Sequence, residues 1–210
     1  MMNTKFHFIN TDVDIYFSPT QKKRTLSVDN IFTVFINNIT KKLNNEEDKQ
    51  SYHRYIDSII NAIHNNDINY IKSNINTTTS SKETIIHTFI FMNKYEYVEK
   101  LLKLNIHPDP KDIDGQTPLF RTIFTDNPDF IDLLIKYGCD INIQDNDGNT
   151  VLHLAVLIRN IPIIKKLISY GVIRDIKNKL NMIPIDLCKI KSGSYITHDQ
   201  DIVKLFTLSN

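Results

Sequence analysis

The side chains that could perform chemistry in this chain are seven histidines, two cysteines and a set of aspartates in two short segments. A catalytic or metal site needs such groups at defined spacings. The sequence contains no G-x-S-x-G nucleophile elbow, no phosphate-binding G-x-x-x-x-G-K-[ST] loop, no H-E-x-x-H helix and no C-x-x-C pair. It therefore predicts a protein that is not an enzyme and that binds no cofactor and no metal ion.

The cysteines and the composition indicate a cellular compartment. Cys139 and Cys188 lack the spacing of a metal site, and Cys188 stands 33 residues after Ala155, in the position of a small buried residue. We therefore expect free thiols and a reducing environment. The net charge of +1 favours neither nucleic acid nor an anionic membrane. Because no long apolar run or signal peptide is present, we expect a cytoplasmic protein, in the host cytoplasm if the chain is viral.

The aspartates form two groups, Asp109 with Asp112 and Asp114, and Asp145 with Asp147, and the predicted partner contacts among them are Asp112, Asp114, Asp145 and Asp147. Aspartate favours turns, because its carboxylate accepts hydrogen bonds from backbone N–H groups two residues later. The same four carboxylates could instead form an acidic rim that meets a basic partner surface. The sequence leaves both interpretations open.

These residues belong to a pattern that recurs along the chain. Gly115 and Gly148 are 33 residues apart, and so are Leu134 and Leu167. A fixed period of this length indicates helix pairs that bury their apolar faces by stacking on their neighbours. Each unit predicts a turn, a short helix that begins after a threonine, and a second helix that ends at a glycine.

The repeated unit resembles the ankyrin repeat. Its T-P-L-H segment is Thr117-Pro118-Leu119-Phe120 in one unit and Thr150-Val151-Leu152-His153 in the next. The resemblance implies an all-α solenoid of about five repeats with a divergent N-terminal cap. It also implies that His87 and His153, which occupy the histidine position of this segment, bond to backbone within and between repeats.

The resemblance covers residues 51–210 and divides them into units. A degraded unit over 51–80 is followed by units over 81–112, 113–145 and 146–178 and by a C-terminal cap over 179–210. Asn105 stands where the later units have glycine, and asparagine also accepts a left-handed conformation. Residues 1–50 form an N-terminal segment and capping helix, with a hairpin turning at residues 10–12, a helix over 27–44 and a turn over 45–50.

The concave side of the predicted array is unusually apolar. In ankyrin-like repeats, the two residues that follow the paired small residues of the inner helix face this side and are polar, whereas three units here have mainly large apolar groups. A contiguous apolar patch marks a partner site. Alternatively, the N-terminal segment covers it. The predicted partner-binding residues, besides the four aspartates, are Phe91, Met92, Arg121, Phe124, Thr125, Leu157 and Ile158.

The expected function is binding rather than catalysis. We expect a protein-binding module, monomeric when free, that inhibits a protein partner stoichiometrically, such as a poxvirus-like antagonist of host defence. The alternative is a bacterial immunity protein that neutralises a toxin enzyme by direct binding. A third hypothesis, an enzyme whose site lies in residues 1–50, is disfavoured because that segment has no cluster of titratable groups.

Overall fold

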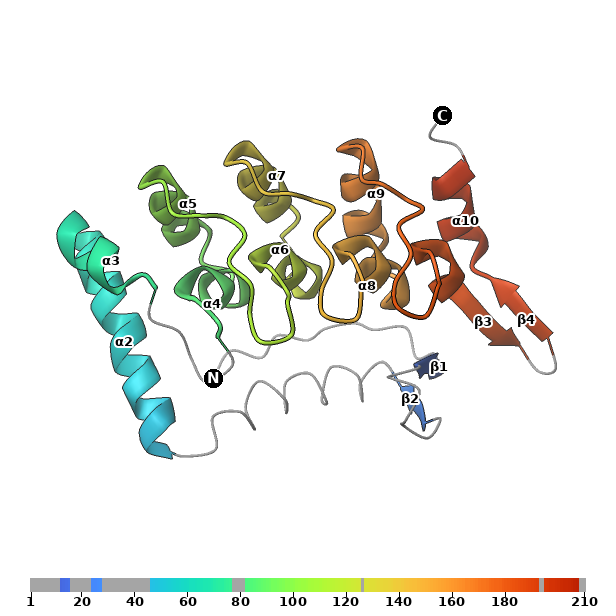
Figure 1. Ribbon diagram of the computed structural model, residues 1–210, viewed down its shortest axis with the longest axis horizontal. Helices are drawn as coiled ribbons and strands as arrows, with labels where there is room; N and C mark the ends of the chain where they lie inside the picture. The colour runs from blue at the N-terminus through green and yellow to red at the C-terminus, as the bar shows by residue number, and fades with distance from the viewer. Residues whose placement is uncertain are drawn as a thin grey trace.

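The computed structural model describes residues 12–15, 24–27, 46–76, 82–125, 127–192 and 195–207, with side chains over 51–76, 82–125, 127–188 and 199–207. Within these residues the chain forms successive pairs of short helices (Figure 1). The pairs are α2 (Glu46–His64) with α3 (Ile68–Asn74), α4 (Ile85–Phe91) with α5 (Tyr95–Lys103), α6 (Pro118–Arg121) and the 3-10 helix η1 (Thr122–Phe124) with α7 (Asp129–Lys136), α8 (Val151–Leu157) with α9 (Ile161–Ser169), and the 3-10 helix η2 (Pro184–Cys188) with α10 (Gln200–Thr207).

The helix pairs stack in a row and form two layers. In Figure 1, the inner helices α4, α6 and α8 lie side by side, and the outer helices α5, α7 and α9 form the second layer. A loop extends from each outer helix to the next inner helix. This arrangement is a helical solenoid and confirms the all-α repeat fold expected from the period of the sequence.

Two β-hairpins accompany the helices. β1 (Asp12–Ile15) pairs antiparallel with β2 (Arg24–Ser27), and β3 (Lys189–Ser192) pairs antiparallel with β4 (Tyr195–His198). Asp12, which was expected in a turn at residues 10–12, lies in β1 and pairs with Ser27, and the rest of the expected turn lies outside the described residues. Ser27 also ends a strand rather than beginning a helix, and the rest of the expected helix lies outside the described residues.

Helix α2 begins earlier than the sequence analysis expected. Residues 45–50 were interpreted as a turn, but α2 already starts at Glu46. The expected turn is therefore wrong over 46–50, because these residues have a helical backbone.

The outer helices end as predicted from their small residues. Asn105, Gly138 and Gly171 follow α5, α7 and α9 with φ angles of 60°, 83° and 74°. Only glycine adopts this left-handed conformation without cost, and asparagine is the next most tolerant residue. The structure thus confirms that Asn105 takes the place of a glycine at the end of α5.

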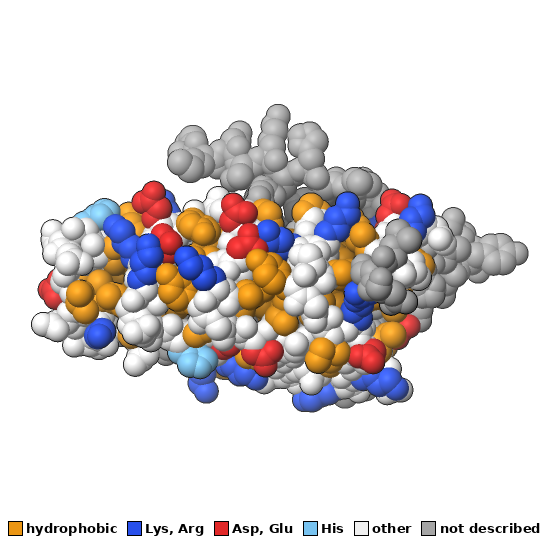
Figure 2. Space-filling model, turned by 90° about the horizontal axis from the view of Figure 1, so that it is seen from above, with side chains coloured by type: hydrophobic (Ala, Val, Ile, Leu, Met, Phe, Trp, Pro, Cys, Tyr) orange, Lys and Arg blue, Asp and Glu red, His pale blue; other side chains and the backbone are white. Residues whose placement is uncertain are grey.

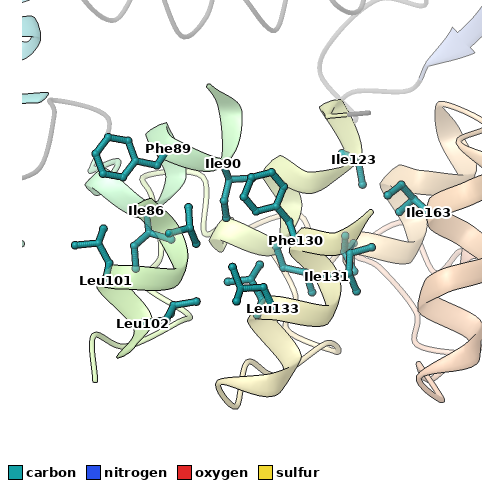
Figure 3. Close-up of a cluster of buried hydrophobic side chains, with 14 of the residues drawn as sticks. Ile86, Phe89, Ile90, Leu101, Leu102, Ile123, Phe130, Ile131, Leu133 and Ile163 are labelled. Carbon is teal, nitrogen blue, oxygen red and sulfur yellow. The ribbon is translucent and has the colours of Figure 1, made fainter. Parts of the chain in front are cut away.

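The core lies between neighbouring helix pairs. In Figure 3, Ile90 of α4 lies beside Phe130 of α7, so the second and third pairs share one apolar layer. Leu134 and Leu167, which the repeat pattern placed in the core, are both 0% exposed. Burying one such side chain contributes about 1.5–3 kcal/mol, so stacking rather than any single pair stabilises the fold.

Two buried histidines connect successive repeats. The carbonyl oxygen of Met182 lies 3.1 Å from His153 Nε2. Because a carbonyl only accepts, Nε2 carries the proton, and Nδ1 accepts from the backbone N–H of Thr150 at 3.1 Å and from its hydroxyl at 2.9 Å. His87 makes the same bonds to Thr84 and to the carbonyl of Gln116. The structural role implied by the resemblance is confirmed.

The third repeat lacks this bond and provides a matched test. Phe120 stands at the histidine position, and the buried hydroxyl of Thr117 has no hydrogen-bond partner in the described part of the chain. We expect Thr150→Val to lower the free energy of unfolding by about 1–2 kcal/mol, and Thr117→Val to change it by less than about 0.5 kcal/mol or to raise it. Urea denaturation measures both values, and equal losses would contradict this assignment.

The buried imidazoles make stability depend on pH. Burial, with the nearby Arg121 charge, lowers the pKa of His87 to about 3. Below about pH 6.5, the imidazole of His87 is therefore protonated in the unfolded chain, whereas in the folded chain it stays neutral to a much lower pH. As pH falls from 6.5 towards 4, we expect His87 to cost on the order of 2–3 kcal/mol of unfolding free energy.

The third repeat indicates which residue can replace His87 in a test of this pH dependence. Because Phe120 already occupies that position, His87→Phe should flatten the fall in unfolding free energy between pH 6.5 and pH 4. The exposed His107 provides the control as His107→Gln. An unchanged slope in His87→Phe, measured by urea denaturation at each pH, would show that the buried imidazole does not cause the acid sensitivity.

Candidate functional site

The loops between helix pairs share one turn. Asp112, Asp145 and Asn178 are spaced at the repeat period, and Oδ1 of each accepts from the backbone N–H groups two and four residues later, at 2.8–3.0 Å. Each of the three also donates its own backbone N–H to the carbonyl four residues later. For Asp112 and Asp145, the structure therefore shows the turn chemistry that the sequence left open.

Successive loops stack on one another. The backbone N–H of Asn146 donates to the carbonyl of Asp114 at 2.8 Å, and Lys179 N–H donates to the carbonyl of Asp147 at 3.0 Å. A Cβ atom on Gly148 would lie 2.9 Å from the backbone nitrogen of Lys179, so a side chain there would collide with the next loop. The turn glycine of the repeat is thus required by this close approach as well as by its φ of 78°.

A buried charge network attaches one loop to its helix. Nη2 of Arg121 lies 2.6 Å from Asp112 Oδ2 and 2.8 Å from Glu83 Oε1, and Nη1 donates to Gln116 Oε1 at 2.8 Å. Arg121 is 3% exposed and Asp112 is 6% exposed. The expectation that these two side chains lie on an open partner surface is therefore corrected: they hold the loop against α4 and α6.

The other predicted polar contacts differ in exposure. Thr125 is buried, and its hydroxyl donates to the carbonyl of Thr122 at 2.9 Å, so its predicted place on the surface is also corrected. Asp145 is half-buried, and burial raises the pKa of its carboxyl group. Asp114 and Asp147 are exposed at the loop tips. Of the four aspartates, only these two have exposed side chains.

The predicted apolar residues lie at the ends of the inner helices. Phe91 and Met92 are 37% and 43% exposed at the end of α4. Phe124 in η1 and Leu157 and Ile158 at the end of α8 are half-buried. Because α4, α6 and α8 are neighbours (Figure 1), these side chains belong to one side of the array. Whether the N-terminal segment covers them lies outside the described residues.

One residue on this side was missed by the sequence analysis. Leu154 is half-buried on α8, three and four residues before Leu157 and Ile158. The i, i+3, i+4 spacing places the three on one helix face, and this spacing could have identified Leu154. At the same register, the other repeats have Thr88 and the buried Arg121. The apolar strip is defined here as Phe91, Met92, Phe124, Leu154, Leu157 and Ile158.

The outer helices present a mixed surface. Figure 2 looks from above onto this side, and basic and acidic side chains are interspersed among hydrophobic ones. Ion pairs contribute to the mixture, for example Lys166 with Asp132 at 2.6 Å and Lys103 with Glu99 at 3.1 Å. Among the described side chains in this view, no single charge sign dominates.

The described residues show little reactive chemistry. No group of three or more histidine, cysteine, aspartate or glutamate side chains in this part of the chain is arranged to hold a metal ion. Cys139 and Cys188 are free thiols, and burial raises the pKa of Cys139 to about 12 and that of Cys188 in the same direction. Both thiols are therefore protonated at neutral pH and are poor nucleophiles.

Comparison with known proteins agrees with the repeat geometry. The family model described as ankyrin repeats (3 copies) matches residues 51–145, 97–178 and 122–206. These overlapping matches extend over most of the chain. No curated protein matches the sequence.

Proposed function

This chain belongs to the ankyrin-repeat family, and from that premise we propose that it binds a protein partner through the apolar strip. Ankyrin repeats are generally protein–protein interaction modules. The observation that carries the proposal is the exposure of Phe91 and Met92, next to four half-buried apolar residues on the neighbouring helices. Large apolar groups exposed together on one side are typical of an interface.

We further propose that binding is itself the activity, so that the chain acts as a stoichiometric inhibitor of its partner in the cytoplasm. Two features support this proposal: the described residues include the apolar strip, and burial lowers the pKa of His87 and raises that of Cys139, which makes both groups poor catalysts at neutral pH. A viral antagonist and a bacterial immunity protein are two forms of this role. In the described part of the chain, no helix has the length and apolar character needed to cross a membrane.

The test uses the most exposed residue of the strip. Phe124 packs against the core and its replacement could unfold the repeat, whereas Met92 is 43% exposed. We expect Met92→Asp to weaken the binding of a captured partner at least tenfold while the melting temperature stays within a few degrees of the parent. The matched control is Ile173→Asp, an apolar residue that is 49% exposed elsewhere. If both variants bound the partner with equal affinity, the strip would not be part of the interface.

A basic surface on the partner would be recognised at the loop tips. We expect the double change Asp114→Asn with Asp147→Asn to slow association several-fold at low salt and hardly at all at high salt, because exposed charges act mainly on association rates. The control is Asp201→Asn, whose side chain is 81% exposed on α10. Stopped-flow association with the captured partner measures the rates. Rates that do not depend on the two loop-tip charges would argue against a basic partner surface.

A further inference from the structure

The loops that follow the outer helices are joined by a side chain of one repeat and a backbone amide of the next. Asp109 Oδ2 accepts from the backbone N–H of Asp140 at 2.9 Å, which joins the second repeat to the third. One period later, Asn142 Oδ1 accepts from the backbone N–H of Ile173 at 2.9 Å, which joins the third repeat to the fourth. These two contacts are called the first and the second junction.

Each joining side chain is also held within its own loop in the same way. The backbone N–H of Asp109 donates to Nδ1 of His107 at 3.0 Å. The backbone N–H of Asn142 donates to Oδ1 of Asp140 at 2.8 Å. The two junctions therefore share one hydrogen-bond pattern and differ in chemistry, because the joining side chain is a carboxyl group in the first and an amide in the second.

The carboxyl group of Asp109 is poorly compensated for its burial. Its Oδ1 atom is buried and has no hydrogen-bond partner in the part of the chain that the structure describes. Burial raises the pKa of Asp109, and the nearby charge of Asp140 acts in the same direction, against the hydrogen bond from the Asp140 N–H and the charge of His107. The Cys139 thiol also interacts with Asp109, but burial raises its pKa to about 12, so it stays neutral in acid. Because burial penalises the charged carboxylate, protonation removes a cost from the first junction.

We propose that Asp109 makes the first junction pH-sensitive, so that the second and third repeats are joined more strongly in mildly acidic solution than at neutral pH. A carboxyl group that binds its proton more tightly in the folded chain than in the unfolded chain stabilises the fold as pH falls. The gain begins near the raised pKa of Asp109 and is complete below the ordinary aspartate pKa of 3.8. It opposes the acid sensitivity expected from His87 and is independent of partner binding.

Hydrogen exchange of two backbone amides in the full chain tests this proposal. Exchange of the Asp140 amide requires the first junction to open, and the Ile173 amide reports the second junction as the matched control. His107 is first replaced by asparagine, whose Oδ1 keeps an acceptor for the loop and carries no titratable group. As pH falls from 7 to 4.5, we expect the protection factor of the Asp140 amide to rise about twofold or more relative to that of Ile173.

Replacing Asp109 with asparagine should remove this pH dependence. Asn142 shows that an amide can make the same bond, so we expect Asp109→Asn to raise the urea midpoint at pH 7. The advantage over the parent should shrink towards pH 4.5, because the parent then gains the protonated form. Asp114→Asn, which removes an exposed carboxylate nearby in the chain, is the control for the change in net charge.

The unsubstituted chain gives a direct measurement as well. In a carbon-13 NMR titration, the carboxyl carbon of Asp109 should have its midpoint above 3.8. Three results would each overturn the inference: a midpoint at or below 3.8, a protection factor of Asp140 that follows that of Ile173 throughout the pH range, or equal effects of Asp109→Asn and Asp114→Asn at pH 7.

Discussion

Replacing Arg121 with leucine is expected to lower the free energy of unfolding by about 3–5 kcal/mol. The change removes the cation that contacts the carboxylates of both Asp112 and Glu83. The side chains of these two residues are only 2% and 12% exposed. Breaking one partner of a buried ion pair costs much more than the pair itself contributes. Leucine fits the position sterically, because Leu154 occupies the same place in the next repeat. Urea denaturation gives the value.

Removing the charges together separates the ionic cost from lost packing. The triple variant Arg121→Met, Asp112→Asn, Glu83→Gln keeps the side-chain volumes and the acceptor oxygen of the turn, so we expect it to recover most of the loss. Asp114→Asn, at the exposed tip of the same loop, should change stability by less than about 0.5 kcal/mol. A loss below about 1 kcal/mol in Arg121→Leu would show that water or another group compensates the carboxylates.

Truncating the outer-helix leucines tests the repeat register. Leu134 and Leu167 are 0% exposed and occupy equivalent places in α7 and α9. We expect Leu134→Ala and Leu167→Ala each to lower the free energy of unfolding by about 2–5 kcal/mol, because the lost apolar contacts leave a cavity. Leu180→Ala, at a residue that is 41% exposed, is the control and should cost little.

The outcome of these truncations also reports on how the repeats are coupled. Stacked repeats share interfaces, so a cavity in one repeat should lower the midpoint of a single cooperative transition. A loss below about 1 kcal/mol at either leucine would mean that the residue is not a core contact and that the register assigned to its repeat is wrong.

The fold could be predicted from the sequence because the residues that determine it lie close together along the chain. Thr150 and His153 lie three residues apart, and Gly148 and Gly171 bound the helix pair at turns that require positive φ. Each of these signals acts within one repeat unit, and the same signals recur one period earlier. The helix pairs, the left-handed conformation at Asn105 and the core position of Leu134 follow from this recurrence.

The candidate site could be predicted only in part from the sequence. The exposure of Phe91 and Met92 agrees with the pattern, because a repeat with its own core complete has no use for further apolar groups. Leu154 did not follow from the repeat pattern, because Thr88 and Arg121 occupy its place in the preceding repeats and no apolar residue recurs there. The β3–β4 hairpin could not be predicted from the repeat period, because no hairpin separates the two helices of the preceding repeat.

The sequence by itself determined the repeat, its helix pairs and its turns, since each depends on side chains a few residues apart. Only the tertiary structure decided the environment of Arg121 and Asp112. Their separation along the chain does not reveal that they meet, and Glu83 reaches the same guanidinium from another repeat. A repeat pattern predicts that a charged residue is exposed. Three charged side chains that stacking brings together can nevertheless be buried as one network.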